Sequence, residues 1–391
     1  MNTPYYVLSL EKLNKNVDSF KSALGKIWPN SKIAYSIKTN SLPWLLDYLR
    51  KNHIMAEAVS DEEYQLAVLC GYKDKEIVFN GPIKGERIIR KAINGEAIIN
   101  IDSKNDLQHV CDAKLKSLKY IGIRVNLDTN LFDAEDIGYI NDGFRFGFSD
   151  KSGELDLVIN KLYEISNIKN FGLHLHCNSI TRSLNVYKTI AKYAADLITR
   201  YNLSPAFIDI GGGFFGGVEG KPTAEQYISV IYNELSGTVD PKVTKLIIEP
   251  GSALIASAID LHTSVVDIKD TANARIVTTD GSRIHIDPLW KKNKYLYDIN
   301  KKNITSTMNI HDKQIICGYT CMDHDRIMSI NNDIVLNIGD EIVYRKVGAY
   351  TTTFGGPFIR YFPDVYIDAE GNKTLIRRMI SVEDYFKMQS L

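Results

Sequence analysis

The distribution of apolar residues is the first informative feature of this chain. Between about residues 30 and 255, short apolar runs of strand-like length alternate with stretches of helical periodicity, such as 61–71 and 183–202. The runs are KIAYSI (32–37), IMAEAVS (54–60), EIVFN (76–80), AIINID (97–102), YIGIRVNL (120–127), FGLHLH (171–176), AFIDIG (206–211) and KLIIEP (245–250). This β-α rhythm predicts an α/β fold with a (β/α)8 TIM barrel. A doubly wound open sheet is the alternative, because the pattern does not reveal closure.

The pattern changes after about residue 258. Runs with period-2 alternation follow, separated by turn residues, and no long helical stretch returns until near the end of the chain. This predicts a mostly antiparallel β barrel or sandwich domain at the C-terminus, joined by the N-terminal strand within residues 3–10. The expected domains are 25–258 for the barrel, and 1–24 with 259–391 for the β domain. Residues 231–243 and 291–303 are expected to be loops or surface turns.

Composition narrows the functional class. The chain has 391 residues, 44% of them hydrophobic and 24% charged, which suffices for one large domain and a smaller one. Its 47 basic and 47 acidic side chains balance, so no net field favours a nucleic acid or an anionic membrane. Five scattered cysteines without a C-x-x-C pair fit a reducing compartment. With neither a signal-like N-terminus nor an apolar span, we expect a cytoplasmic protein.

Lys38 follows the first predicted strand, in the run Ala-Tyr-Ser-Ile-Lys-Thr-Asn (34–40). By itself, a lysine in this position is more often the cap of a surface loop than a catalytic residue. Because it stands beside apolar residues with no local acid partner, we expect its ammonium to lose solvation and its pKa to fall. A neutral, fixed amine is what a Schiff base to pyridoxal phosphate (PLP) requires.

Further polar features end other predicted strands. His176 ends the sixth run, the triple glycine 211–213 follows the seventh, and Glu249 ends the eighth. In a barrel of parallel strands, such residues collect on one face. Glycine amides suit a phosphate, a carboxylate keeps a pyridine nitrogen protonated, and an imidazole stacks on a ring. The plainer interpretations are a flexible loop, a structural turn and a core histidine, and we prefer the last for His174.

The remaining candidates are less specific. His174 and His176 point to the same side of their strand, but no third ligand stands at metal spacing, so no metal site is expected. The run CGYTCMDHD (317–325) is compatible with an acid/base or redox cluster, although inert buried cysteines are more common. Gly348-Ala349-Tyr350 offers a phenol to a phosphate.

Taken in order, these motifs resemble the group IV PLP-dependent decarboxylases of fold type III, the alanine-racemase-like fold. This family includes diaminopimelate, ornithine/arginine and carboxynorspermidine decarboxylases. The motifs that carry the resemblance are Y-S-I-K-T-N, H-L-H-C-N-S, G-G-G, E-P-G, C-G-Y-T-C-M-D-H-D and G-A-Y. The resemblance implies a carboxy-lyase (EC 4.1.1 type) that uses PLP and a small amino-acid substrate. It also implies a homodimer with shared active sites, and neither nucleic acid nor membrane as a partner.

The resemblance also implies roles for individual residues. Lys38 would form the Schiff base with PLP, His176 would stack on the ring, and Cys321 would protonate Cα. The implied cofactor-binding set is Lys38, Glu57, His176, Ser179, Gly211, Gly212, Gly213, Glu249, Gly251, Ser252 and Tyr350. The implied substrate set is Arg145, Asp287, Cys321, Met322 and Asp325, with Cys321 and Asp325 reaching the partner subunit's site.

Departures from the family motifs concern the distal end of the substrate. The usual Glu-Pro-Gly-Arg is Glu-Pro-Gly-Ser here, so Ser252 replaces an arginine that helps to bind phosphate or substrate. Met322 stands where an acid reads a distal amine, and Asp287 stands where an arginine before proline reads a distal carboxylate. Glu57 replaces a common aspartate. We therefore expect meso-diaminopimelate to be a poor substrate, and a modified or carrier-linked amino acid is a hypothesis.

Two other functions remain open at this point. An amino-acid racemase of the same fold would also use a PLP lysine, although such enzymes place a tyrosine where this chain has the Cys321 motif. A non-catalytic PLP-binding homologue is the other alternative. Both Lys38 and Cys321 are present, and the β domain follows the barrel, which favours the decarboxylase.

Overall fold

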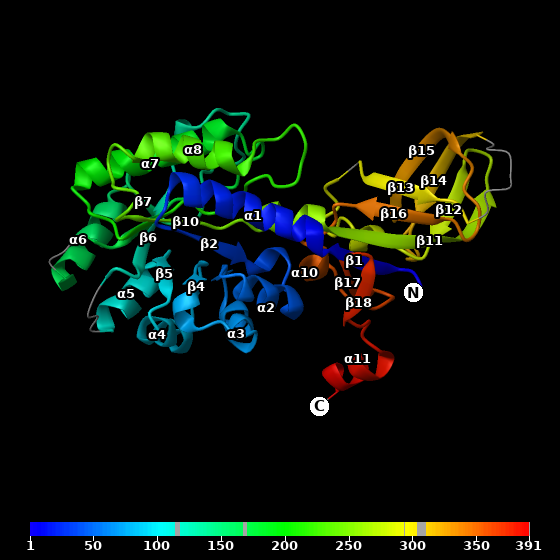
Figure 1. Cartoon of the computed structure of the whole chain (residues 1–391), viewed down its shortest axis with the longest axis horizontal. Coiled ribbons are helices and arrows are strands. Elements are labelled where there is room, and N and C mark those ends of the chain that lie inside the picture. Colours follow the sequence, from blue (N-terminus) through cyan, green and yellow to red (C-terminus); the bar gives the residue numbers. More distant parts are fainter. Residues whose placement is uncertain (114–117, 167–169, 293, 303–309, 391) are drawn as a thin grey trace. The chain divides into compact units, whose positions relative to one another are not determined.

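The computed structural model describes residues 1–113, 118–166, 170–292, 294–302 and 310–390. These residues form two compact units (Figure 1). The barrel unit comprises Asn16–Ala253, and the β unit comprises Met1–Lys15 with Leu254–Leu391. Helix α1 (Leu10–Ile27) contributes residues to both units.

The barrel unit is built on a closed ring of eight parallel strands. These are β2 (Ser31–Ser36), β3 (Met55–Ala58), β4 (Ile77–Phe79), β5 (Ile98–Ile101), β6 (Ile121–Asn126), β8 (Gly172–His174), β9 (Phe207–Asp209) and β10 (Lys245–Ile248). The pairings of β5 with β6 and of β10 with β2 close the ring. The short β7 (Phe148–Ser149) pairs with β6. The predicted (β/α)8 barrel is therefore confirmed, and the open sheet is excluded.

Helices follow the barrel strands and surround them (Figure 1). They are α2 (Pro43–Lys51), α3 (Asp61–Leu69), α4 (Glu86–Asn94), α5 (Lys104–Asp112), α6 (Glu154–Ser166), α7 (Leu184–Tyr201) and α8 (Ala224–Leu235), with 3-10 turns η1 (Ile37–Thr39), η2 (Asp74–Glu76) and η3 (Thr129–Leu131). Side-chain oxygens cap several of their N-termini, for example Ser183 on α7. The expected loop at 231–243 is wrong for residues 231–235, because Ile228, Ile231 and Leu235 bury one face of α8.

The interior of the barrel has an apolar layer and a polar layer. The apolar layer is formed by Ala34, Met55, Val78, Ile98, Phe207 and Ile247, one from each of six strands. Side chains two positions apart point to the same face of a strand. The polar layer consists of the residues two positions further along each strand. On β6 and β8 the count starts from Gly122 and Gly172, which stand at the level of the apolar layer. The eight residues are Ser36, Glu57, Asn80, Asn100, Arg124, His174, Asp209 and Glu249. Every strand therefore has a polar side chain near its C-terminal end or, for Asn80 and Glu249, directly after it.

Glycines on β6 and β8 make room for one large ring in the apolar layer. A Cβ atom at Gly122 would lie 2.8 Å from the ring of Phe207, and one at Gly172 would lie 2.3 Å from it. Phe207 is itself only 1% exposed. The ring therefore occupies the space that side chains on two neighbouring strands would otherwise fill.

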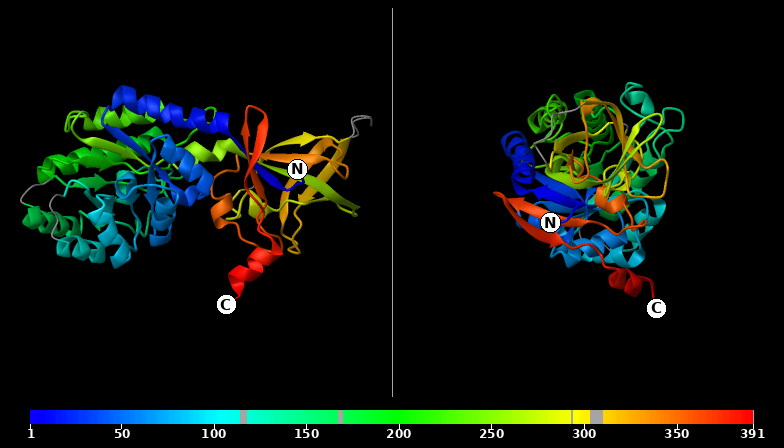
Figure 2. Two further views of the ribbon diagram at one scale, coloured as in Figure 1. Left: turned by 60° about the horizontal axis from the view of Figure 1, so that its bottom comes forward. Right: turned by 90° about the vertical axis from the view of Figure 1, so that its right-hand side faces the viewer.

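The β unit is a mostly antiparallel sheet, as predicted, and it includes the N-terminal strand. Its strands are β1 (Tyr5–Ser9), β11 (Ile259–Asp270), β12 (Arg275–Thr279), β13 (Leu296–Asn300), β14 (Ile310–Cys317), β15 (Arg326–Ile334), β16 (Glu341–Arg345), β17 (Asp364–Ala369) and β18 (Asn372–Arg377). Its helices and turns are α9 (Ser252–Ile255), which begins at the unit boundary, η4 (Ala256–Ala258), η5 (Arg283–His285), α10 (Thr351–Phe354) and α11 (Val382–Gln389). The hairpin of β17 and β18 leads to α11 (Figure 2).

One expected loop in the β unit is a strand. Residues 291–303 were expected to lack regular structure, but β13 pairs antiparallel with β16 through all five of its residues. Alternate residues of β13 are exposed, and its two polar residues, Asp298 and Asn300, lie on the solvent-facing side of the strand. None of the helices in the described residues combines the length and apolarity of a membrane span.

Candidate functional site

Lys38 lies in the turn η1, directly after β2. Its Nζ donates to Glu57 Oε2 at 2.5 Å, and Glu57 on β3 is 1% exposed. The expectation that Lys38 lacks an acid partner and has a lowered pKa is therefore wrong. Burial acts to lower the pKa of Lys38, but the carboxylates of Glu57 and Glu249 outweigh it and raise the pKa. Lys38 is consequently held as an ammonium in this arrangement.

Asn80 joins the two acids on either side of the site. Its Nδ2 donates to Glu57 Oε1 at 3.0 Å and to Glu249 Oε1 at 2.6 Å. Asn100 Nδ2 in turn donates to Asn80 Oδ1 at 2.8 Å and to Asp209 Oδ2 at 3.1 Å. Five residues of the polar layer therefore form one hydrogen-bonded network, which fixes the positions of all three carboxyl groups relative to Lys38.

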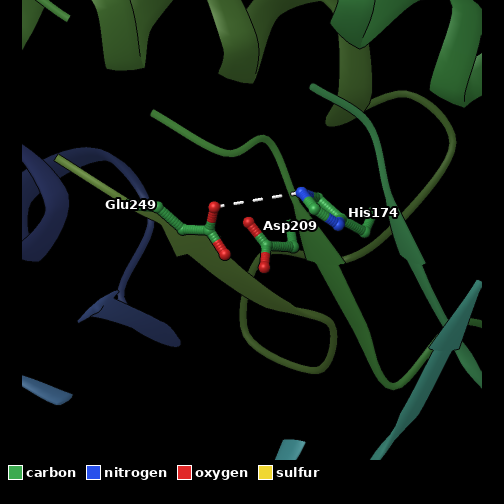
Figure 3. Close-up of side chains that lie close together, drawn as sticks. All are labelled: His174, Asp209 and Glu249. Carbon is green, nitrogen blue, oxygen red and sulfur yellow. Dashed lines mark ion pairs between the residues drawn. The ribbon is translucent and has the colours of Figure 1, made fainter. Parts of the chain in front are cut away.

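Glu249 and Asp209 form a buried acid pair, with His174 beside them (Figure 3). Burial raises the pKa of Asp209 to about 6. Burial, followed by the charges of Asp209 and Glu57, raises the pKa of Glu249 well above its usual range. Two carboxyl groups this close and this deeply buried favour a shared proton over two negative charges.

His174, Asp209 and Glu249 also have the residue types of a metal site, with ligand atoms within 4.8 Å of one another. The sequence argument against metal considered only nearby positions and missed this grouping, because its members come from three strands. Both Asp209 oxygens, however, already accept hydrogen bonds, from the Gly211 amide and from Asn100. The geometry therefore suits a proton better than a divalent cation.

The two histidines differ in their surroundings. His174 is 1% exposed, and neither of its ring nitrogens has a hydrogen-bond partner among the described residues, so the expected hydrogen-bonded core histidine is not found. The nearest acid oxygen is Glu249 Oε2, 3.9 Å from His174 Nε2. Burial, with the charge of Arg124, lowers the pKa of His176 to about 3. The same two causes lower the pKa of His174 well below its usual range, so both imidazoles are neutral near pH 7.

The glycine loop packs tightly against the site. Gly211 has a φ of +67°, and a Cβ there would lie 2.6 Å from the side chain of His176. A Cβ at Gly212 would lie 2.2 Å from the Glu249 carbonyl oxygen, and one at Gly251 would lie 2.0 Å from Thr39 Oγ1, next to Lys38. The backbone amides of Gly212 and Gly213 have no hydrogen-bond acceptor within the part of the chain that the structure describes. Such unpartnered amides form a cradle for an anion.

Ser179 and Ser252 are linked through an arginine that the sequence reasoning missed. The amide of Arg182 donates to Ser179 Oγ at 2.9 Å, and its Nη1 donates to Ser252 Oγ at 3.3 Å. Ser179 Oγ also donates to the carbonyl of Asp136 at 3.0 Å. The two serines of the predicted cofactor set thus belong to one hydrogen-bonded group.

Arg145 is exposed on the loop after β6. Its guanidinium lies 4.3 Å from the ring centroid of Phe146, and that of Arg124 lies 4.5 Å from the same ring. Arg124 also pairs with Asp102 at 3.0 Å, and Asp102 accepts the amide of Gly147. The loop that carries Arg145 is therefore fastened to the polar layer through Arg124.

The β unit contains the remaining predicted residues. Cys321 is exposed, and Met322 is half-buried beside it. Asp325 is 2% exposed and accepts hydrogen bonds from Ser282 Oγ at 2.9 Å, from the Arg283 amide at 3.0 Å and from the hydroxyl of Thr320 at 2.8 Å. Its carboxylate therefore fixes the shape of the loop that presents Cys321.

Asp287 is saturated by its own segment. Its carboxylate accepts the amides of Lys291 at 3.2 Å and Lys292 at 2.8 Å, the hydroxyl of Tyr295 at 3.1 Å, and the guanidinium of Arg283 at 3.2 Å. With 4% exposure, it has a structural explanation that needs no substrate.

Tyr350 begins helix α10 in a left-handed conformation, with φ of +67°. The preceding Gly348 leaves no room for a side chain, because a Cβ there would lie 2.2 Å from the Ile255 carbonyl oxygen. The backbone around the phenol is therefore closely defined.

The comparison with known families follows from this geometry. Residues 10–256 match the model of the pyridoxal binding domain of pyridoxal-dependent decarboxylases. The chain belongs to this family. The predicted relationship is confirmed, and the protein is a PLP-dependent carboxy-lyase.

Individual relatives agree with the family. The chain is 27% identical to diaminopimelate decarboxylase of Zymomonas mobilis, over 98% of this chain and 92% of the relative. It is 24% identical to the Archaeoglobus fulgidus diaminopimelate decarboxylase, over 89% of this chain and 83% of the relative. The fold matches diaminopimelate decarboxylase from Helicobacter pylori complexed with L-lysine, with a TM-score of 0.82, 23% identity and coverage of 100% and 97%. It also matches the Chlorella virus arginine decarboxylase, with a TM-score of 0.77, 18% identity and coverage of 94% and 96%.

The barrel unit of the decarboxylase fits its cofactor. An amine, two unpartnered glycine amides, a buried carboxyl group and a neutral imidazole come together there, as PLP requires. Sequence reasoning missed Asn80, Asn100, Asp209 and Arg124. All four could have been found from one sequence feature, because each is a polar residue two positions after the strand residue that points into the barrel interior.

Proposed function

We propose that this decarboxylase acts on a free amino acid, or a derivative of one, whose side chain does not end in a carboxylate. The observation that carries the decarboxylase site is the placement of Lys38 and Glu249 at opposite ends of one hydrogen-bonded chain through Glu57 and Asn80, while the substrate class rests on three other positions described below. That chain sets an amine and a ring-nitrogen partner at fixed positions, which supports the assignment of the barrel site.

The barrel residues would hold PLP as follows. Lys38 would bind the aldehyde carbon, and Glu249 would face the ring nitrogen. The amides of the triple glycine, with Ser179 and Tyr350, would contact the phosphate, and His176 would cover one ring face. When bound, PLP supplies a protonated ring that withdraws electrons from the bonds at the substrate Cα.

Two protons define the state of the site. One lies between Lys38 Nζ and Glu57 Oε2, so the amine becomes nucleophilic only when Glu57 or solvent takes that proton. The other is shared by Glu249 and Asp209. A cationic ring nitrogen beside Glu249 would favour its ionised form, and the proton would then remain on Asp209 or move to the ring.

We propose that Cys321 donates a proton to Cα and that a homodimer completes the site, as the family resemblance implies. The support is that Cys321 is exposed on a loop fixed by Asp325, so its thiol is presented and not buried. Mixing Lys38→Ala and Cys321→Ala homodimers should restore about a quarter of wild-type activity, because each hybrid dimer has one intact site. No restoration would contradict a shared site.

The proposed substrate class rests on the residues at positions 252, 287 and 322. Ser252 is neutral, Met322 offers only a thioether, and Asp287 is saturated by its own loop. A distal carboxylate would gain no guanidinium from these positions, which should cost about 1.5–3 kcal/mol of binding free energy per lost charged hydrogen bond. Although the relatives are diaminopimelate decarboxylases, we propose that meso-diaminopimelate is a poor substrate. Carrier attachment has no support in the relatives, so we propose a free substrate.

The test is a panel of amino acids incubated with PLP-loaded enzyme, with carbon dioxide release and product mass measured together. We expect release from one or more substrates that lack a distal carboxylate. Turnover of meso-diaminopimelate at a rate equal to the best substrate would refute the substrate class. Optical inversion without carbon dioxide would instead indicate a racemase.

A further inference from the structure

Arg182 has an unusual electrostatic position in the barrel unit. Its guanidinium donates from Nη1 to the neutral hydroxyl of Ser252 at 3.3 Å and lies 5.3 Å from the ring centroid of Phe215. Among the described residues, no carboxylate lies within ion-pair distance of it. Arginine is always charged and has five N–H donors, so most of its donors and its whole charge are left for another partner.

The backbone of Arg182 is held in a conformation that is unfavourable for its side chain. Its φ is +54°, which lies in the left-handed region. Its amide donates to Ser179 Oγ at 2.9 Å, and its carbonyl accepts the hydroxyl of Tyr227 at 2.7 Å. One hydrogen bond within the loop and one from α8 therefore fix the backbone from which the side chain starts, and the hydrogen bond to Ser252 directs the guanidinium.

The guanidinium lies where two segments of the cofactor site meet. Ser252 directly follows Glu249-Pro250-Gly251, and Phe215 lies two positions after the triple glycine 211–213. These segments touch each other, because a Cβ at Gly216 would lie 2.0 Å from the Ala253 carbonyl oxygen. The unpaired charge of Arg182 is therefore next to the loop whose amides at 212 and 213 lack partners.

We propose that Arg182 binds the phosphate of PLP and supplies the guanidinium that Ser252 does not. Arg182, which stands just before α7, places a positive charge in this part of the cofactor site, and the hydroxyl of Ser252 holds its guanidinium there. A phosphate dianion between this guanidinium and the glycine amides would satisfy both. The inference rests on the placement of the phosphate at the glycine loop, as proposed above.

The test compares two cofactor forms that differ only in the phosphate. Apoprotein is titrated with PLP and with pyridoxal, and binding is followed by absorbance of the cofactor bound through Lys38. In Arg182→Gln, affinity for PLP should fall about 10- to 100-fold, while affinity for pyridoxal should not change. Arg87→Gln, an exposed arginine of α4 that contacts Gln65, is the matched control and should bind both forms as wild type does.

A second variant tests position against charge. Arg182→Ser combined with Ser252→Arg should bind PLP more tightly than Arg182→Ser alone, because the guanidinium returns to the same corner. Unchanged PLP affinity in Arg182→Gln, an equal loss for PLP and pyridoxal, or no recovery in the double variant would each overturn the proposal. Lys38→Ala separates this failure from that of the site itself, since it should abolish the absorbance with either form.

Discussion

Replacing Gly211 by alanine tests the tight packing between the glycine loop and His176. Two costs add at this position. The backbone is left-handed, with φ of +67°, and the new Cβ would lie 2.6 Å from Cβ, Cγ and Nδ1 of His176. These atoms are close to the His176 backbone, so the ring cannot move aside by a simple rotation of its far end. Gly153 offers a matched control, because its φ is +78° and nothing lies within 4 Å of its Cβ position.

The magnitudes follow from this difference. A left-handed backbone costs an alanine about 1–2 kcal/mol, part of which is offset by the lower entropy of the unfolded chain. Gly153→Ala should therefore lower the free energy of unfolding by about 1 kcal/mol or less. Gly211→Ala adds an overpacking cost of about 1–3 kcal/mol, so its loss should total about 1–4 kcal/mol.

The assay is urea-induced unfolding of the apoprotein, followed by tryptophan fluorescence. Two of the three tryptophans, Trp28 and Trp44, belong to the barrel unit. A PLP titration of both variants should show weaker binding only for Gly211→Ala, because His176 is displaced. If Gly211→Ala matched Gly153→Ala in stability and bound PLP as wild type does, the reasoning would be refuted.

Three further outcomes are expected. The pKa of His176 is depressed from 6.5 to about 3, so its contribution to the free energy of unfolding is complete above about pH 6.5 and is lost as the pH falls toward 3. In urea titrations at acid pH, His176→Gln should therefore lose less stability than wild type. An identical pH profile would count against a neutral buried imidazole. Asp325→Ala should lower kcat and destabilise the β unit by about 1–3 kcal/mol, because the hydroxyls of Ser282 and Thr320 lose their acceptor. The control is Asp323→Ala, at an exposed neighbouring position, which should change neither kcat nor stability. Lys84→Met should cost about 3–5 kcal/mol of unfolding free energy, since it leaves the buried carboxylate of Asp106 without its cation. Adding Asp106→Leu should recover most of that loss. Equal melting of the single and double variants would exclude this explanation.

Much of the fold was predictable because parallel barrel strands are buried on both faces. Such strands leave nearly continuous apolar runs, and each of the eight predicted runs overlaps a barrel strand. β13 was missed for the opposite reason, since its alternate residues face solvent and the segment around it, KKNKYLYDINKKN, is rich in lysine and asparagine. The end of α8 was missed because loop-like letters at 233–238 hid the apolar face of its last turn.

The site was predictable as a set of strand-end residues but not as a network. Lys38 and Glu57 are 19 positions apart in the sequence and become neighbours only because β2 pairs with β3, which places Ser36 opposite Glu57. A strand-end asparagine such as Asn80 looks like a turn residue until its partners are known. The pKa of Lys38 was mispredicted for this reason, because its partner lies on another strand.

The ring of Phe207 connects three positions that are far apart in the sequence. It fills space that Gly122 and Gly172 leave open, so a larger residue at Gly172 requires a smaller one at 207, while a Cβ at Gly122 would also lie 2.1 Å from Asn100 Oδ1. Single substitutions at either glycine should be harmful in this background, and a smaller residue at 207 should relieve the clash at Gly172 but only part of the clash at Gly122. Among descendants of this barrel, these three sites should covary, and chimeras that exchange β9 without β6 and β8 should fail to fold even when every exchanged segment is native to a functional enzyme.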